Sequence, residues 1–283
     1  MPVINGIEYF QKNINEIPYE IIKFGNFWLK PNLITFKNRF SWQDQIDLIW
    51  KDKGEFKAQS LSFKEVNQIA TQIGGLFLER FNNLFENKKN FQNLPMNNTK
   101  IMGILNITPD SFSDGGKFFD EKKALEHAKF MNENGAHIID IGGESTKPNA
   151  SNVNEDEETK RILKVIEKLA KDNFLISADT RNSSVMSKAI DSGARIINDV
   201  SGMSDPLTPS VIAKSSASIV IMHMQGSPQT MQKNPYYKFA PIDIFNFLEN
   251  KINLAKSYGI ELERIAIDPG FGFGKKPKHN MEI

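Results

Sequence analysis

Six short apolar runs between residues 101 and 270 constrain the fold of this 283-residue chain more than any other feature. Each run is rich in β-branched residues and is bounded by polar loops or by stretches with helical periodicity. Runs of this kind are typical of strands that are buried on both faces, as in a parallel sheet. In chain order they read IMGILNI, HIIDIG, FLISAD, RIINDV, SIVIMHM and RIAIDPG.

Helical patterns occupy the intervals between these runs. Residues 120–135 carry apolar side chains at helical spacing and finish at Gly135, a residue suited to the end of a helix. Residues 154–173 begin with acids and finish with lysines, which complements a helix dipole. This alternation predicts a βα series, either a (β/α)8 barrel or an open doubly wound sheet.

Polar residues suited to chemistry follow almost every apolar run. In an open sheet such residues should concentrate where the strand order reverses, whereas in a barrel every strand end points into one mouth. The pattern therefore favours a (β/α)8 TIM barrel, of which about six βα units are present, although loops are polar in any case. The strand-end residues are Asn106, Asp140, Glu144, Asp179, Asn198, Asp199, His223 and Asp268.

The composition changes at residues 87–100, a polar segment rich in Asn and Lys that reads as a linker. We therefore expect two parts, a small α+β extension over residues 1–97 and a barrel domain over residues 98–283. No catalytic side chains gather at a recognisable spacing in the extension. A packing or oligomerisation role is the expectation for it.

Local patterns predict the elements of the extension. Residues 19–38 suggest two short strands around a turn, and residues 41–50 suggest a short helix opened by Ser41. A longer helix follows, because Ser62 and Glu65 form a capping box ahead of apolar residues at helical spacing that extend to Phe77.

Composition excludes several classes of function. A formal net charge of +1 gives no support for a nucleic-acid or membrane surface. The absence of cysteine excludes disulfides, thiolate metal sites and cysteine nucleophiles. No apolar run approaches the roughly 20 residues of a membrane span, and no signal peptide is recognisable. We expect a cytoplasmic protein.

The strand ends suggest a site for a flat heterocycle. Asp179 and Asn198 follow adjacent strands, and a carboxylate beside a carboxamide suits ring N–H and amino donors. The alternative is a buried pair that satisfies backbone groups. Asp268 could accept two hydrogen bonds from a guanidine-like edge, Phe273 could stack on the ring, and Lys275 could supply positive charge. The glycines around them fit neither a P-loop nor a dinucleotide fingerprint.

Other loops suggest an anion site. Asn106 offers a neutral amide where an anion or Mg²⁺ could bind, with a structural Asx turn as the alternative. Thr146 and Lys147 pair a hydroxyl donor with a cation, which suits a phosphate oxygen. Met224 could form a soft apolar wall for a ring. A metal role for His223 is not expected, because the other histidines show no ligand spacing with it.

Taken together, residues 101–280 resemble dihydropteroate synthase, whose fold is a (β/α)8 barrel. That enzyme joins p-aminobenzoate to the pyrophosphate ester of hydroxymethyl-dihydropterin, releases pyrophosphate, and is a sulfonamide target. The blocks that carry the resemblance, in the order of the family, are GILNITPDSFSDGG, DIGGEST, ISADT, INDVSG, MHMQGSP and DPGFGFGK.

The resemblance implies roles for individual residues. Asp179, Asn198 and Asp268 would hold the pterin, with Met224 and Phe273 as walls of the ring pockets. The pyrophosphate and its Mg²⁺ would lie with Asn106 and Thr146. The loops around Asp110 and Ser145 would close over p-aminobenzoate. The family is commonly dimeric, so the resemblance also implies a homodimer.

Two departures from the family pattern are visible. Lys147 stands where the family usually has Arg, which keeps the charge and loses bidentate geometry. The family also continues past the His279–Asn280 dipeptide with two further βα units, so we expect a truncated version of a longer enzyme. Two alternatives are a catalytically silent pterin-binding protein and a pterin-dependent methyltransferase domain, although the latter would not need the NITPDSFSDGG loop.

Overall fold

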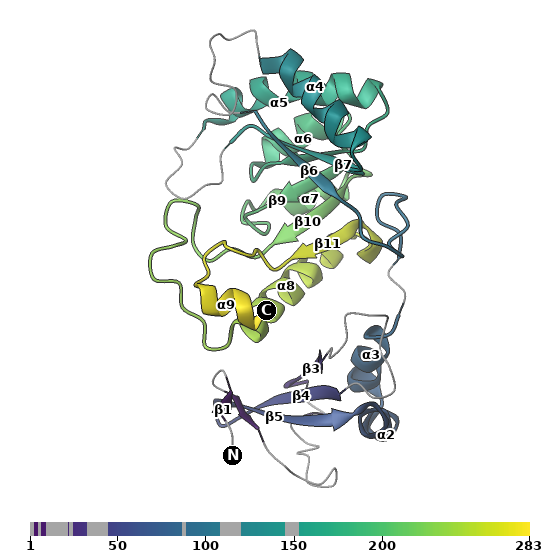
Figure 1. Cartoon of the computed structure of the whole chain (residues 1–283), viewed down its shortest axis with the longest axis vertical. Helices are drawn as coiled ribbons and strands as arrows, with labels where there is room; N and C mark the ends of the chain where they lie inside the picture. The colour runs from purple at the N-terminus through teal and green to yellow at the C-terminus, as the bar shows by residue number, and fades with distance from the viewer. Residues whose placement is uncertain are drawn as a thin grey trace. The chain divides into compact units, whose positions relative to one another are not determined.

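The computed structural model describes residues 3–4, 7–9, 22, 25–32, 45–86, 89–107, 120–144 and 153–283. The chain forms two compact units, Met1–Asn87 and Lys88–Ile283 (Figure 1). Residues 88–97 therefore belong to the second unit and not to the N-terminal part, where composition had placed them.

The first unit contains a five-stranded sheet in the order β1-β2-β5-β4-β3. Strands β2 and β5 pair in parallel, and the other neighbours pair antiparallel. Two helices, α2 (Phe63–Ile73) and α3 (Gly75–Asn83), follow the last strand. The strands are β1 (Val3–Ile4), β2 (Ile7–Tyr9), β3 (Phe27–Asn32), β4 (Gln45–Asp52) and β5 (Glu55–Ser62).

Strand β4 occupies residues for which the sequence predicted a helix, so the helix expected over residues 41–50 is wrong from Gln45 onward; residues 41–44 lie outside the described part. The side chains of Ile46, Leu48 and Trp50 alternate along β4 and pack in one core with α2 and α3. Partners on both sides, β3 and β5, supply its backbone hydrogen bonds. Alternation and long-range pairing therefore outweighed the local helix signal.

The predicted capping box is confirmed at the start of α2, where the Ser62 side chain accepts from the backbone N–H of Glu65 and the Glu65 side chain caps in return. The helical pattern that extends to Phe77 is divided in two, because Gly74 has φ +65° and ends α2. Of the two strands expected over residues 19–38, the described residues contain β3.

The second unit contains a six-stranded sheet in the order β11-β10-β9-β8-β7-β6, and every pair is parallel. Strands that follow one another in the sequence are also neighbours in the sheet. All six predicted strands are confirmed. They are β6 (Met102–Asn106), β7 (Ile138–Gly142), β8 (Ile176–Asp179), β9 (Ile196–Asp199), β10 (Ser218–Met222) and β11 (Ile265–Asp268).

Helices pack on one face of this sheet and form the main core with it (Figure 1). The helix predicted over 120–135 and the one predicted over 154–173 are both confirmed, and Asn154 caps the second of them. The helices are α4 (Asp120–Glu133), α5 (Glu155–Lys171), α6 (Ser183–Asp191), α7 (Thr208–Ala213), α8 (Ala240–Ser257), a 3₁₀ turn (Leu262–Arg264) and α9 (Pro277–Glu282).

The opposite face of the sheet is apolar where the strands begin and polar where they end. Phe91, Ile138 and Ile196 form a small core there, joined by side chains that include Leu94 and Met96. The segment before β6 therefore closes the N-terminal end of this face and leaves the C-terminal strand ends for polar groups. Within the described part, no helix is long and apolar enough to cross a membrane.

Candidate functional site

Polar side chains converge on Gly142, at the C-terminal end of β7. The strand register places Gly142 between Asn106 of β6 and Asp179 of β8. A Cβ atom added to Gly142 would lie 3.1 Å from Oδ1 of Asn106 and 3.4 Å from Oδ2 of Asp179. The missing side chain therefore lets two of the predicted site residues approach each other across the strand.

Asn198 joins this group from the next strand. It lies opposite Asp179 in the β8–β9 register, and its Nδ2 donates to Oδ2 of Asp140 at 2.9 Å. Asp140 is 3% exposed and lies opposite Ser177 in the β7–β8 register. Oδ1 of Asp140 and the Ser177 hydroxyl are both buried, and among the described residues neither has a partner at hydrogen-bonding geometry. The face of the sheet opposite the helices thus carries a buried polar layer directly below the C-terminal strand ends.

The environment of these acids favours their neutral forms. Burial raises the pKa of Asp140, and the nearby Ser177 hydroxyl and Asn198 amide oppose this only in part. Burial also raises the pKa of Asp179 well above its usual value, and the negative charge of Asp140 adds to the effect. Two neighbouring carboxyls with raised pKa values can hold a proton or accept hydrogen bonds from a ligand.

Asp268, at the end of β11, lies at the opposite end of the row of strand ends from Asn106. It lies opposite Met222 in the β10–β11 register, and its backbone carbonyl accepts from the N–H of His223 at 2.9 Å. Its Oδ1 accepts from the backbone N–H of Gly270 at 2.7 Å. The tight glycine turn therefore orients the carboxylate, as a ligand-binding role requires.

Three further predicted residues lie on the loops after β10 and β11. Met224 and Phe273 are half-buried. Lys275 is 3% exposed, and its Nζ lies 3.0 Å from Nδ1 of His223 and 3.0 Å from the carbonyl of Phe273. A third contact reaches the His223 carbonyl at 3.3 Å. Because protein groups take up the ammonium, contact between Lys275 and a substrate stays a prediction.

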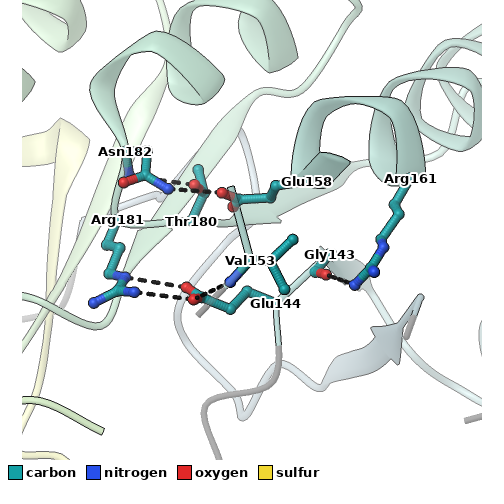
Figure 2. Close-up of polar contacts among 8 residues, drawn as sticks. All are labelled: Gly143, Glu144, Val153, Glu158, Arg161, Thr180, Arg181 and Asn182. Atoms are coloured by element: carbon teal, nitrogen blue, oxygen red, sulfur yellow. Dashed lines mark hydrogen bonds and ion pairs between the residues drawn. The ribbon is translucent and has the colours of Figure 1, made fainter. Parts of the chain in front are cut away.

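Ser145, Thr146 and Lys147 lie outside the described residues, so their predicted roles stay untested. The residues that flank them are held together (Figure 2). Glu144 is nearly buried, and its Oε1 accepts from the N–H of Val153 at 3.2 Å.

The same carboxylate binds Arg181 through two hydrogen bonds, from Nε at 3.0 Å and from Nη2 at 2.9 Å (Figure 2). Arg181 was not predicted as a site residue. Its position two residues after Asp179 could have indicated it, because a side chain there lies in the loop that follows the C-terminal end of β8. The pairing links the loop after β7 with the loop after β8.

Two more contacts tie these loops to helix α5 (Figure 2). Nη1 of Arg161 donates to the carbonyl of Gly143 at 2.8 Å. Nδ2 of Asn182 donates to Oε2 of Glu158 at 2.7 Å, and burial raises the pKa of Glu158. The mouth formed by β7 and β8 is therefore rigidly connected to its supporting helix.

A parallel α/β sheet with converging polar side chains at its strand ends defines an enzyme-like ligand site. Residues 102–283 match the family model described as pterin binding enzyme, so the chain belongs to that family. The dihydropteroate synthase of Haemophilus influenzae is 46% identical over 185 residues, which are 65% of this chain and 67% of that protein.

Solved structures give the same result. The dihydropteroate synthase of Yersinia pestis, in a sulfonamide drug complex, is 43% identical with a TM-score of 0.61, covering 65% of this chain and 67% of that one. The enzyme of Xanthomonas albilineans, solved with 4-aminobenzoic acid, is 39% identical with a TM-score of 0.62, covering 67% of each chain. The barrel class predicted from the sequence is confirmed, and the match spans about two thirds of these relatives.

Proposed function

We propose that this chain carries the reaction of dihydropteroate synthase, the condensation of p-aminobenzoate with hydroxymethyl-dihydropterin pyrophosphate in folate biosynthesis. The observation that carries the proposal is the row of strand ends, where Asn106, Asp179, Asn198 and Asp268 occupy four strands of a sheet that matches this family. A flat ring rich in N–H donors is the ligand that such a row of acceptors recognises.

Recognition of the pterin follows from the acceptors. The oriented carboxylate of Asp268 suits the edge where an amino group stands beside a ring N–H. Asp179 and Asn198 would accept from, or donate to, the opposite edge, with Asn198 held from below by Asp140. Half-buried Met224 and Phe273 would pack against the ring faces.

The pyrophosphate end of the substrate requires positive charge. Among the described residues, no group of three His, Cys, Asp or Glu side chains could hold a metal ion. Asn106 is an exposed residue, and its amide oxygen nevertheless fits Mg²⁺, an ion that is often held by one or two protein oxygens together with waters and phosphate oxygens. Mg²⁺ bound there would neutralise charge on the departing pyrophosphate. Thr146 and Lys147 are proposed to donate to the same phosphates.

The reaction then needs no covalent bond to the protein. The bond between the exocyclic carbon and the pyrophosphate oxygen breaks, which leaves a cation delocalised into the pterin. The oriented carboxylate of Asp268 would stabilise that charge. The amino nitrogen of p-aminobenzoate forms the new C–N bond and loses a proton to solvent. We also propose that the protein works in the cytoplasm and as a homodimer, which cell fractionation and sedimentation would test.

Pyrophosphate release tests the proposal. The protein is incubated with both substrates and Mg²⁺, and each component is omitted in turn. We expect release that needs all three components and that Asp268→Ala abolishes. Release that survives Asp268→Ala would overturn the site assignment. Binding of the pterin without turnover would instead support the catalytically silent alternative.

A further inference from the structure

The ammonium group of Lys275 is buried and is hydrogen-bonded to protein atoms. The side chain is 3% exposed, and its Nζ meets Nδ1 of His223, the His223 carbonyl and the Phe273 carbonyl at 3.0, 3.3 and 3.0 Å. These partners come from two loops, one after β10 and one after β11. A single buried cation therefore joins the ends of the two strands on the Asp268 side of the site.

The two loops are also pressed together along their backbones. Gly270 has φ +69°, and a Cβ atom there would lie 2.1 Å from the carbonyl oxygen of His223. A Cβ atom on Gly274 would lie 2.9 Å from the backbone nitrogen and oxygen of Gln225. The hydroxyl of Tyr237 donates to the carbonyl of Gly274 at 2.7 Å. Such close approach explains the glycines and leaves little freedom for the loop after β11.

His223 is fixed from the other side by aromatic rings. Its imidazole lies 4.9 Å from the ring of Phe247 and 5.8 Å from that of Tyr237, measured between centroids. Burial lowers the pKa of Lys275 to about 8 and that of His223 to about 4. Near neutral pH a charged lysine therefore faces a neutral imidazole, and Nδ1 must be the acceptor. The remaining ring proton is then on Nε2.

We propose that Lys275 and His223 form a positioning pair that holds Asp268 and Phe273 in the arrangement that binds the pterin. Lys275 binds the carbonyl of Phe273, and the backbone N–H of His223 binds the carbonyl of Asp268. The pair thus sets both ring-binding residues through their backbone carbonyls. This inference rests on the proposed function, because it names a pterin as the ligand.

Replacement of the buried ammonium tests the pair, with a neighbouring lysine as control. Lys275→Met keeps the length of the stem and removes the donors, whereas Lys276→Met removes an exposed ammonium one residue away. Calorimetry with hydroxymethyl-dihydropterin pyrophosphate should show about tenfold weaker binding for Lys275→Met and no change for Lys276→Met. In turnover assays KM for the pterin should rise while kcat changes by less than about threefold. Equal affinity of Lys275→Met and the wild type would overturn the inference.

A second arm acts from the histidine side. His223→Gln keeps an acceptor for Lys275, and His223→Leu removes it, so glutamine should restore most of the pterin affinity that leucine loses. The wild-type chain has four histidines, which makes their imidazole ¹⁵N signals assignable. We expect an unprotonated Nδ1 and a protonated Nε2 at His223. A protonated Nδ1 would overturn the pair even if both the Lys275 and His223 variants failed to fold.

The two arms separate this inference from the proposed function. If the wild-type protein fails to bind the pterin, the proposed function fails, while the ¹⁵N signals still report on the Lys275–His223 bond. If the wild type binds and Lys275→Met binds equally well, only the positioning pair fails.

Discussion

At the scale of single residues, the site relies on acids that the fold holds in unfavourable surroundings. Asp140 is buried below the strand ends, and its raised pKa means that the native state binds its proton more tightly than the unfolded chain does. The associated stability is present below the ordinary pKa of 3.8 and is lost as the pH rises through the native value. Asp140 therefore lowers stability near neutral pH, and its hydrogen bond with Asn198 gives the reason for an acid at this position.

Asp140→Asn should therefore separate stability from binding. The neutral amide removes the proton-linked loss, so the free energy of unfolding at pH 7–8 should rise. Pterin affinity should fall by about five- to tenfold, because the Asn198 amide loses its carboxyl acceptor. Denaturant unfolding and calorimetry check the two effects, with the exposed Asp191→Asn as control. A variant that loses stability and keeps its affinity would contradict this account.

The titration of His223 gives a prediction about acid. Its pKa is lowered from 6.5 to about 4 by burial and by the charge of Lys275, so the unfolded chain binds this proton more readily than the native state. The free energy of unfolding should therefore fall as the pH drops from about 6.5 towards about 4. His223→Gln should flatten that part of the stability curve. The same slope in the variant would show that another group is responsible.

The residue types at the site were predictable from the sequence, but their partners were not. Asp179, Asn198 and Asp268 stand out because acids and amides rarely end buried strands without a purpose. The contact between Asp140 and Asn198 depends on the register of two strands, and that between Lys275 and His223 on two loops 52 residues apart. No local pattern encodes such distances, so Lys275 could be read only as a free charge.

At the scale of elements, the ends of parallel strands supply the chemistry, and small residues decide how closely the side chains approach. Gly142 is the last residue of β7, and the side chains of Asn106 and Asp179 occupy the space that its missing side chain leaves. Gly143, the next residue, faces helix α5 instead, where an added Cβ atom would lie 3.0 Å from the Glu158 carbonyl and from Ile162. The two glycines thus have separate purposes, one for the site and one for packing.

Alanine substitutions at these glycines should have opposite effects. Gly142→Ala should push Asn106 and Asp179 apart and weaken pterin binding about tenfold, with less than about 1 kcal/mol change in unfolding free energy. Gly143→Ala should instead cost about 1–3 kcal/mol of stability through overpacking and leave the affinity of the folded protein unchanged. Calorimetry and thermal unfolding of both variants provide the comparison. Equal losses of affinity would mean that the strand end is not shaped as described.

Elements with a strong periodic signal were predicted well, and those that depend on distant partners were not. The six apolar runs became strands because helices cover one face and a polar layer with its apolar base occupies the other. Residues 45–52 carry a pattern that suits either a helix or a strand. Pairing with β3 and β5 decides the outcome, and that pairing is invisible in a local window.

At the scale of the whole molecule, the described residues of each unit form a core of their own. The first unit packs Phe77 against Phe27, with ring centroids 4.8 Å apart. The second unit has its main core between sheet and helices, and residues such as Phe91 complete the base of the sheet. The composition change at residues 87–100 located this division only approximately, because polar segments can still contribute buried side chains.

Because each unit has its own core, we expect two unfolding transitions. A mutation in one core should shift the transition of that unit alone. Phe91→Ala should lower the stability of the second unit by about 3–5 kcal/mol, and Phe77→Ala should do the same for the first unit. Differential scanning calorimetry should show each variant moving one transition and leaving the other in place. A single transition that both variants shift equally would show that the units unfold together.

The pterin site at the strand ends is tested by the dissociation constant of hydroxymethyl-dihydropterin pyrophosphate, measured for the wild type and for Asp268→Asn. The oriented carboxylate of Asp268 should contribute about 1.5–3 kcal/mol through charged hydrogen bonds, so the substitution should weaken binding by about ten- to a hundredfold. The control Asp191→Asn should bind as the wild type does. Equal affinity of Asp268→Asn and the wild type would contradict the assignment of the strand ends as the pterin site.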